Sequence, residues 1–447
     1  MTGPRTGSGV APARAAAFAI LLQVATSDAH SDELLRSREV DALSAQDRAL
    51  ATTLVLGTLR WQLALDAEIQ RLLSRPEAKP APAVQVALRL GAYQLRYLDR
   101  IPAHAAIGES VELAKRAGER FAAGMVNAVL RKLAREPVQA GTGRSLADEF
   151  AHPQWMVARW ERFYGTDAAR AICAFDQEPA TLSIRLVHPD AEDALAEDGV
   201  ELVQGEFLAA ARRVVKGDVA RSRAYRKGWV RIQDEASQLV AELAGKGERI
   251  LDVCAAPGGK TAILAERNPN AAITAFDVSQ RRLDAMRRNV ADARVQCVVQ
   301  DATAMELEPD YDLILCDVPC SGTGTIGRNP EIRFRVDEAG IARQQARQIR
   351  ILARALEGLV PGGRLLYSTC SLEPEENEAV VAEVLARNGA WGRAPLEGEI
   401  LRLERAGVLH ANGAARLRAS ALREGCLRTL PGVHPCDGFF AALIVRR

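Results

Sequence analysis

Two cysteines stand in short polar loops, each directly after a hydrophobic segment of the kind that forms a buried strand. Cys320 lies in DVPCSG over residues 317–322, and Cys370 lies in YSTCS over residues 367–371. A thiolate can add to a ring carbon, and a second thiol can assist the proton transfers. A lone cysteine is more often a small core residue. Beside a methyl donor, this pair would have the groups needed to methylate carbon 5 of a pyrimidine.

A glycine-rich turn, DVCAAPGGK over residues 252–260, lies upstream of both cysteines. It follows a predicted strand and opens a predicted helix, so that helix N–H groups would face a ligand. Gly259, Lys260 and Thr261 match the end of a phosphate-binding P-loop. The first glycine of that motif would be at position 254, which is Cys254, and Pro257 removes a backbone donor. A nucleotide triphosphatase is therefore the weaker interpretation.

Three aspartates follow predicted strands of the same domain. Asp277 could hold ribose hydroxyls, and Asp301 could hold an adenine amino group. A single aspartate in such a place is usually a helix cap. Two of them behind the glycine turn favour S-adenosyl-L-methionine as cofactor. Asp317 could hydrogen-bond the ring nitrogen and exocyclic amine of a bound pyrimidine.

The elements that must position these residues alternate between strand and helix from about residue 249 onward. This pattern predicts a parallel, doubly wound, Rossmann-like α/β sheet, whose ligands bind at the carboxyl ends of the strands. The predicted strands are Arg249–Val253, Ala272–Phe276, Val295–Val299, Tyr311–Cys316 and Arg364–Ser368, with a further strand over Gly438–Val445. Residues 396–425 are charged and match no clear pattern.

The N-terminal part predicts helices only. Residues 15–140 repeat apolar positions at three and four, which indicates an all-α bundle. Residues 1–14 are rich in Gly, Pro, Ser and Thr and are expected to be disordered. The apolar segment Ala15–Val24 is too short to span a membrane, and Gln23 interrupts it, so that it predicts a buried first helix and not a signal peptide.

Composition limits the class of protein. The chain has 447 residues, of which 48% are hydrophobic, and this predicts two or three folded domains. The eight cysteines form no Cys-x-x-Cys motif and do not cluster with the six histidines. We therefore expect free thiols in a reducing, cytoplasmic setting, with neither disulfides nor a metal site.

A net charge of +1 means that nucleic-acid binding would depend on local basic segments. The Gly/Thr-rich stretch Pro137–Ser145 predicts a linker. One basic segment runs from Arg212 to Arg231, with Tyr225 and Trp229 among the charges, and predicts a linker and RNA-recognition subdomain over residues 141–232. The other follows the Cys320 loop, and its members are Arg328, Arg333, Arg335, Arg343, Arg347 and Arg350. The alternative for both is a solvated surface.

The motifs together resemble a known family. The segments DVCAAPGGK, DVPCSGTG (317–324) and STCSLEPEEN (368–377) look like signatures of RNA 5-methylcytosine methyltransferases, and QDEASQ (233–238) resembles the segment before that catalytic domain. Residues 15 to about 135 look like a NusB-type helical domain, especially Ile107–Lys115 and Val126–Leu133. A NusB-like domain before a methyltransferase domain over residues 233–447 is the layout of the RsmB (Sun, Fmu) family, which acts on 16S ribosomal RNA.

The resemblance also implies residue roles. Cys370 would be the nucleophile on carbon 6, and Cys320 would help release the product. Asp317 would hold the base, with Lys260 beside it. The cofactor would be held by Asp277, Asp301, Asp317 and the turn residues Cys254, Ala255, Ala256, Pro257, Gly258, Gly259 and Lys260.

The resemblance implies small-subunit ribosomal RNA as partner. We also expect a monomer, and no membrane association, because no apolar segment approaches the length of a membrane span. Three other functions stay open. DNA cytosine methyltransferases attack from a Pro-Cys motif, so that the second cysteine favours RNA. A non-catalytic RNA-binding or antitermination factor would need only the helical part. A methyltransferase acting on protein or small molecules would need neither the cysteine pair nor the basic segments, and transfer RNA is an alternative substrate.

Overall fold

The computed structural model describes residues 9–77, 79–137, 145–290 and 292–446, and it divides into two compact units. Unit 1 comprises the described parts of Met1–Glu178 together with Ile326–Arg335. Unit 2 comprises Pro179–Thr325 and Val336–Arg447, again in their described parts. Within these ranges, no helix is both long and apolar enough to cross a bilayer.

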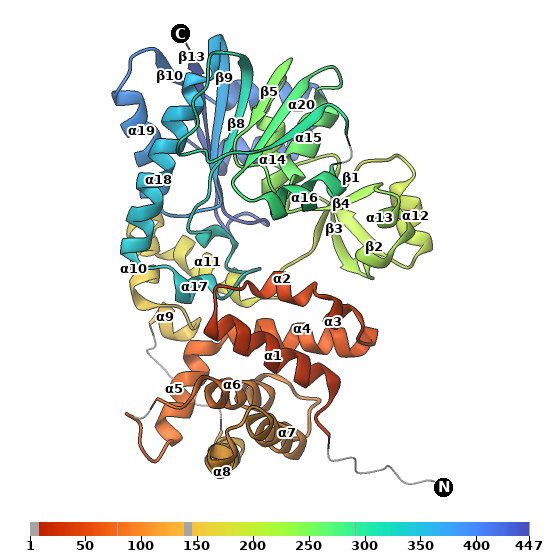
Figure 1. The fold of residues 1–447 in the computed structure, drawn as a ribbon, viewed down its shortest axis with the longest axis vertical. Helices are drawn as coiled ribbons and strands as arrows, with labels where there is room; N and C mark the ends of the chain where they lie inside the picture. The colour runs from red at the N-terminus through yellow and green to blue at the C-terminus, as the bar shows by residue number, and fades with distance from the viewer. Residues whose placement is uncertain (1–8, 78, 138–144, 291, 447) are drawn as a thin grey trace. The chain divides into compact units, whose positions relative to one another are not determined.

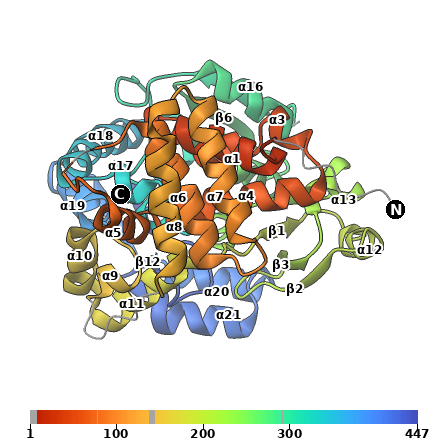
Figure 2. The ribbon, with the colours of Figure 1, turned by 90° about the horizontal axis from the view of Figure 1, so that it is seen from below.

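Unit 1 is built of helices, as the apolar periodicity predicts, and Figure 2 shows α6, α7 and α8 packed side by side. Its buried core is formed by residues such as Leu54, Leu88 and Leu130. The helices are α1 (Pro12–Thr26), α2 (Ser31–Leu35), α3 (Arg38–Asp41), α4 (Ala45–Arg60), α5 (Gln62–Leu72), α6 (Pro82–Tyr97), α7 (Ala103–Arg116), η1 (Arg120–Ala122), α8 (Ala123–Arg135), α9 (Leu146–Glu149), α10 (Gln154–Tyr164), α11 (Thr166–Gln177) and α17 (Ile332–Arg335).

The expected disorder of residues 1–14 is wrong for its last part, and residues 1–8 lie outside the described residues. Helix α1 begins at Pro12, a residue suited to the first turn because a helix needs no N–H there. Arg14 is buried, and its guanidinium donates to Gln94 and Glu109. The predicted linker near residues 137–145 lies almost wholly outside the described residues.

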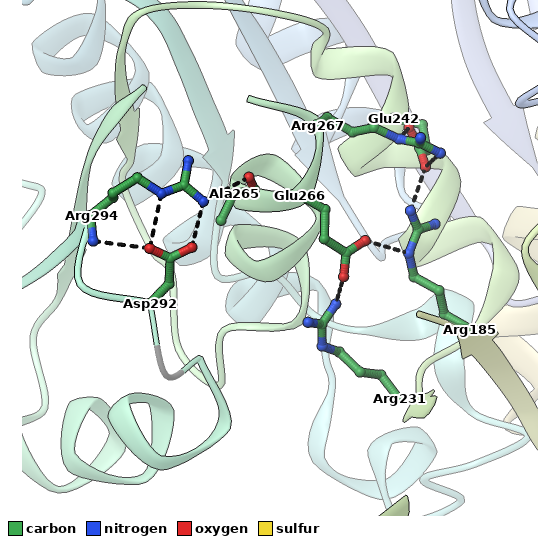
Figure 3. A network of polar contacts seen from close by, with 8 residues as sticks. All are labelled: Arg185, Arg231, Glu242, Ala265, Glu266, Arg267, Asp292 and Arg294. Carbon is green, nitrogen blue, oxygen red and sulfur yellow. Dashed lines mark hydrogen bonds and ion pairs between the residues drawn. The ribbon is translucent and has the colours of Figure 1, made fainter. Parts of the chain in front are cut away.

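Unit 2 contains a small antiparallel sheet with strand order β2-β3-β1-β4. Its strands are β1 (Ser183–Leu186), β2 (Glu201–Gln204), β3 (Ala211–Lys216) and β4 (Val230–Ile232), with helices α12 (Ala191–Glu197), η2 (Val219–Arg221) and α13 (Arg223–Arg226). A network of ion pairs joins this sheet to the neighbouring helices α14 (Glu235–Ala244) and α15 (Gly259–Arg267) (Figure 3). Arg185 of β1 contacts both Glu242 and Glu266, and Arg231 of β4 also contacts Glu266.

The large sheet of unit 2 has nine strands in the order β11-β12-β13-β9-β8-β5-β6-β7, with β10 beside β13. Figure 1 labels β5, β8, β9, β10 and β13 of this sheet. The five predicted strands are present and parallel: β5 (Arg249–Asp252), β6 (Ala272–Asp277), β7 (Val295–Val299), β8 (Tyr311–Asp317) and β9 (Leu359–Thr369). The Rossmann-like fold is therefore confirmed. The sheet is mixed, however, because the remaining strands pair antiparallel: β10 (Trp391–Ala394), β11 (Leu422–Arg423), β12 (Cys426–Thr429) and β13 (Phe439–Arg446).

Alternating residues of the central strands enter two different cores, because successive strand side chains point to opposite faces. Leu313 and Leu315 pack with α14 and α20, whereas Ile314 and Cys316 pack with α18 and α19 (Figure 1). The other helices of unit 2 are α16 (Gln280–Asn289), η3 (Thr323–Thr325), α18 (Glu338–Glu357), η4 (Pro374–Glu376), α19 (Glu378–Ala386), α20 (Glu397–Arg405), α21 (Ala411–Arg416) and η5 (Leu417–Ala421).

Candidate active site

The two cysteines meet at the carboxyl ends of neighbouring parallel strands. Asp317, the last residue of β8, lies in register with Ser368 of β9, so that the loops after both strands begin side by side. The Sγ atoms of Cys320 and Cys370 are 3.4 Å apart, and both thiols are free. Contact with Cys370 and burial raise the pKa of Cys320 well above its usual range. The pair can therefore carry one negative charge far more readily than two.

Lys260 and Asp317 form an ion pair beside the cysteines. The Lys260 Nζ donates to Asp317 Oδ2 at 2.7 Å, and Ser368 Oγ donates to Asp317 Oδ1 at 2.6 Å. Burial is the largest single influence and would lower the pKa of Lys260, but Asp317, Cys370 and Asp252 together outweigh it, so that the pKa is raised and the side chain stays cationic. Cys370 also contributes to this electrostatic environment of Lys260. Each Asp317 oxygen keeps a second lone pair for a ligand.

A cavity of about 200 Å³ joins the cysteines to the predicted cofactor residues. Asp277, Asp301 and Asp317 line it together with Cys320 and Cys370. Asp277 is buried, accepts from the Ser279 N–H, and pairs with Arg282 at 3.2 Å. Thr303 donates twice to Asp301 and holds the pKa of that carboxyl below its usual range.

The glycine turn contributes to this cavity through Val253, Cys254 and Ala256. Burial raises the pKa of Cys254, which makes it a neutral wall. Gly258 has a φ of 97°, and a Cβ there would stand 2.7 Å from Met286 of α16. Glycine is therefore required at this position for a left-handed turn and for close packing against α16. Gly258 is not among the described residues that line the cavity, and neither are the other predicted cofactor residues of the turn, Ala255, Pro257, Gly259 and Lys260.

The donor set of the cavity fits S-adenosylmethionine. The Asp277 and Asp301 carboxylates can accept hydrogen bonds from ribose hydroxyls and an adenine amine, and Val278, Ala302 and Ile351 supply apolar surface for a base. The cysteines lie at the same cavity. A bound methyl donor and a target base could therefore meet beside the thiol pair.

Glu376 was not predicted as a site residue, although it connects the two cysteine loops. Its carboxylate accepts the Ser321 N–H at 2.8 Å and the hydroxyls of Ser321 and Ser371. Gln348 of α18 donates to the same carboxylate and to the Pro319 carbonyl. The sequence offers no signal for this role, because a buried glutamate in PEEN looks like the first turn of an exposed helix.

The basic segments differ from what their charge suggests. In the first, Arg212, Arg223 and Arg231 are paired with glutamates. The Trp229 ring stacks on His188 at 4.3 Å and lies under the Lys227 ammonium at 4.2 Å, so that its faces already have partners. Tyr225 remains exposed.

In the second segment, the expectation of RNA contact is wrong for the buried Arg333, and for the exposed Arg335 it stays a prediction. Arg333 is buried within unit 1 and donates to the carbonyls of Arg60 and Ala151. Arg335 donates to carbonyls in the loop after α1, including that of Ala29 at 2.7 Å. Arg347 lines the cavity of unit 2. Sequence alone cannot distinguish an arginine that donates to backbone carbonyls from one whose guanidinium is available to bind an RNA phosphate.

Comparison with known proteins identifies both parts of the chain. A family described as 16S rRNA methyltransferase RsmB/F matches residues 242–445, and the NusB family matches residues 11–135. A protein of Bacillus subtilis (strain 168) named "Probable ribosomal RNA small subunit methyltransferase B" is 34% identical over 95% of this chain and 96% of its own. A Pseudomonas putida protein named "Ribosomal RNA small subunit methyltransferase B" is 36% identical over 78% of this chain and 83% of its own.

A solved structure supports the catalytic fold. The crystal structure of a methyltransferase homolog protein from Pyrococcus horikoshii is 27% identical, with a TM-score of 0.53, and covers 68% of this chain and 98% of its own. The chain therefore belongs to the 16S rRNA methyltransferase RsmB/F family, with a NusB-family domain preceding an S-adenosylmethionine-dependent methyltransferase domain.

Proposed function

We propose that this protein transfers a methyl group from S-adenosylmethionine to carbon 5 of a cytosine in 16S ribosomal RNA, through a covalent bond between Cys370 and carbon 6. The observation that carries the proposal is the pair of thiols 3.4 Å apart at the cavity lined by Asp277 and Asp301. When bound there, S-adenosylmethionine supplies an electrophilic methyl group. The names of the curated relatives support small-subunit ribosomal RNA as the substrate.

The chain's own residues perform the remaining steps. Asp317 accepts a hydrogen bond from the base, and the Lys260 ammonium, which donates to Asp317, holds that carboxylate in place. The Cys370 thiolate bonds to carbon 6, which makes carbon 5 electron-rich, and carbon 5 takes the methyl group. A base then takes the carbon-5 proton, the electrons of that C–H bond restore the double bond between carbons 5 and 6, and Cys370 leaves carbon 6 as a thiolate.

Cys320 is suited to the release step because of what surrounds it. Contact with Cys370 is the largest cause of its raised pKa. Once Cys370 is bonded to carbon 6 it carries no negative charge, so that this cause is removed and the pKa of Cys320 falls. Cys320 can then lose its own proton to solvent, and the thiolate that remains can take the carbon-5 proton. The same pair thus provides a nucleophile first and an aid to proton removal second.

The Cys370→Ala variant tests the role of the nucleophile. We expect it to lose methylation of unmodified 16S ribosomal RNA while its affinity for S-adenosylmethionine changes by less than about threefold, since no cofactor carboxylate is altered. Cys297→Ala is the matched control, because this cysteine lies on β7 and does not line the cavity. Methylation by Cys370→Ala at the wild-type rate would refute the covalent mechanism.

A further inference from the structure

The two thiols of the pair lie in different electrostatic surroundings. The cationic Lys260 interacts with Cys370, and Lys260 is itself held by Asp317. The Glu376 carboxylate interacts with Cys320 and is bonded to the backbone N–H of the next residue, Ser321. One sulfur thus has a fixed cation near it, and the other has a fixed carboxylate.

The contacts of Glu376 suit an ionised carboxylate. Its oxygens accept from the Ser321 N–H, the Ser321 hydroxyl, the Ser371 hydroxyl and the Gln348 amide, and four donors match the lone pairs of a carboxylate. The Ser371 hydroxyl itself accepts from the Glu373 N–H, so that its hydrogen is available for Glu376. Burial raises the pKa of Glu376, and these donors oppose the shift.

Glu376 is also a mechanical link. Ser321 directly follows Cys320, and Ser371 directly follows Cys370, so that one carboxylate ties both cysteine loops. Gln348 extends the link to α18 through the Pro319 carbonyl. The backbone of Glu376 is held in turn, since the Tyr367 hydroxyl donates to its carbonyl at 2.6 Å.

We propose, on the basis of the function above, that Glu376 is a positioning residue that determines which thiol is the nucleophile: its carboxylate holds the Cys320 loop and places a negative charge on the Cys320 side of the pair, while the Lys260 ammonium places a positive charge on the Cys370 side. This explains how two thiols in contact take different roles. The other titratable or charged groups around the pair are Asp317 of β8, Tyr367 of β9 and Arg347 of α18.

The test is residue-resolved alkylation of the full-length protein by iodoacetamide, followed by mass spectrometry across a range of pH. Only the thiolate reacts, so that the rate at each cysteine reports its ionised fraction. In Glu376→Gln, which keeps the size but removes the charge, we expect the ratio of Cys320 to Cys370 alkylation at neutral pH to rise about tenfold, the change caused by one pKa unit.

Two matched variants separate charge from packing. Glu375→Gln removes the same charge one residue away and should leave the ratio within about twofold of the wild type. Glu376→Asp keeps the charge and should restore a low ratio. An unchanged ratio in Glu376→Gln, or an equal rise at both cysteines together with a lower melting temperature, would overturn the proposal.

A kinetic readout accompanies the alkylation. Glu376→Gln should lower kcat and leave the KM for RNA unchanged, because the wrong thiol then competes for the reaction with the bound base while the RNA contacts are unaltered. The alkylation needs neither RNA nor cofactor, so that it decides the role of Glu376 even if the wild type fails to methylate ribosomal RNA. Failure of the wild type to methylate ribosomal RNA would instead contradict the proposed function.

Discussion

At the scale of single residues, the candidate site depends on acid–base partners that fix each charge. Lys260 is cationic because Asp317 accompanies it, and Glu376 is placed by four donors. Asp277 occupies the end of β6 with Arg282 against its carboxylate. A ribose would compete with Arg282 for this carboxylate, and the half-exposed Arg282 side chain can turn toward solvent.

Asp277→Ala should weaken the binding of S-adenosylmethionine by about 1.5–3 kcal/mol, the usual contribution of hydrogen bonds to a charged group. Isothermal titration calorimetry would show this as a roughly 10- to 100-fold rise in Kd. The control is Asp284→Ala on α16, whose carboxylate accepts from Gln280 and Arg287 and does not line the cavity. Equal affinities for the Asp277 variant and the wild type would remove Asp277 from the cofactor site.

Much of the site could be predicted from the sequence because it follows strand ends. Parallel strands bring their carboxyl ends to one edge, so that Asp277, Asp301, Asp317, Cys320 and Cys370 converge whatever the loops do. Glu376 and Arg347 were not predictable in the same way. Their roles depend on how η4 and α18 pack against the loops, and no local pattern specifies that packing.

At the scale of elements, periodicity predicted the central strands but not the C-terminal additions. The segment 396–425 matched no pattern, and it folds as α20, α21, the π-helix η5 and the short strand β11. Its apolar residues, such as Ile400 and Leu417, pack in the same core as α14. Short elements carry too few apolar residues for a period to be recognised.

A histidine in this C-terminal region makes stability depend on pH. His434 is buried; its Nδ1 accepts from the Leu430 N–H at 2.9 Å, so that Nε2 carries the hydrogen and faces Ser420 Oγ at 3.1 Å. Burial lowers its pKa from 6.5 to about 4. In the unfolded chain His434 therefore binds a proton near pH 6.5, whereas in the folded chain it binds a proton only near pH 4.

The free energy of unfolding should thus fall as the pH drops through this window, by about 2 kcal/mol at about pH 5 from this residue. In His434→Gln, the difference in unfolding free energy between about pH 7 and about pH 5 should be smaller by that amount. Urea denaturation at both pH values measures it. Identical pH dependence in the variant and the wild type would show that His434 does not stay neutral in the fold.

At the scale of the whole molecule, the chain of the catalytic loop continues into unit 1. Residues 326–335 come only a few residues after Cys320 in the chain, yet they belong to unit 1 and not to unit 2. There the Glu331 carboxylate accepts from both the backbone N–H and the hydroxyl of Ser31 at 2.9 Å. A division of the sequence into a helical domain and a later catalytic domain could not predict that residues 326–335 belong to unit 1, because their sequence indicates only a basic segment.

The covalent mechanism is the central claim, and trapping the adduct in cells tests it most directly. Cys320→Ala should slow release from carbon 6, so that protein stays bonded to RNA on a denaturing gel, and sequencing the attached RNA should identify one cytosine of 16S ribosomal RNA. The adduct should vanish in Cys320→Ala/Cys370→Ala. An adduct that survives the loss of Cys370, or none at all from a Cys320→Ala enzyme that still methylates ribosomal RNA at the wild-type rate, would contradict the roles given to both thiols.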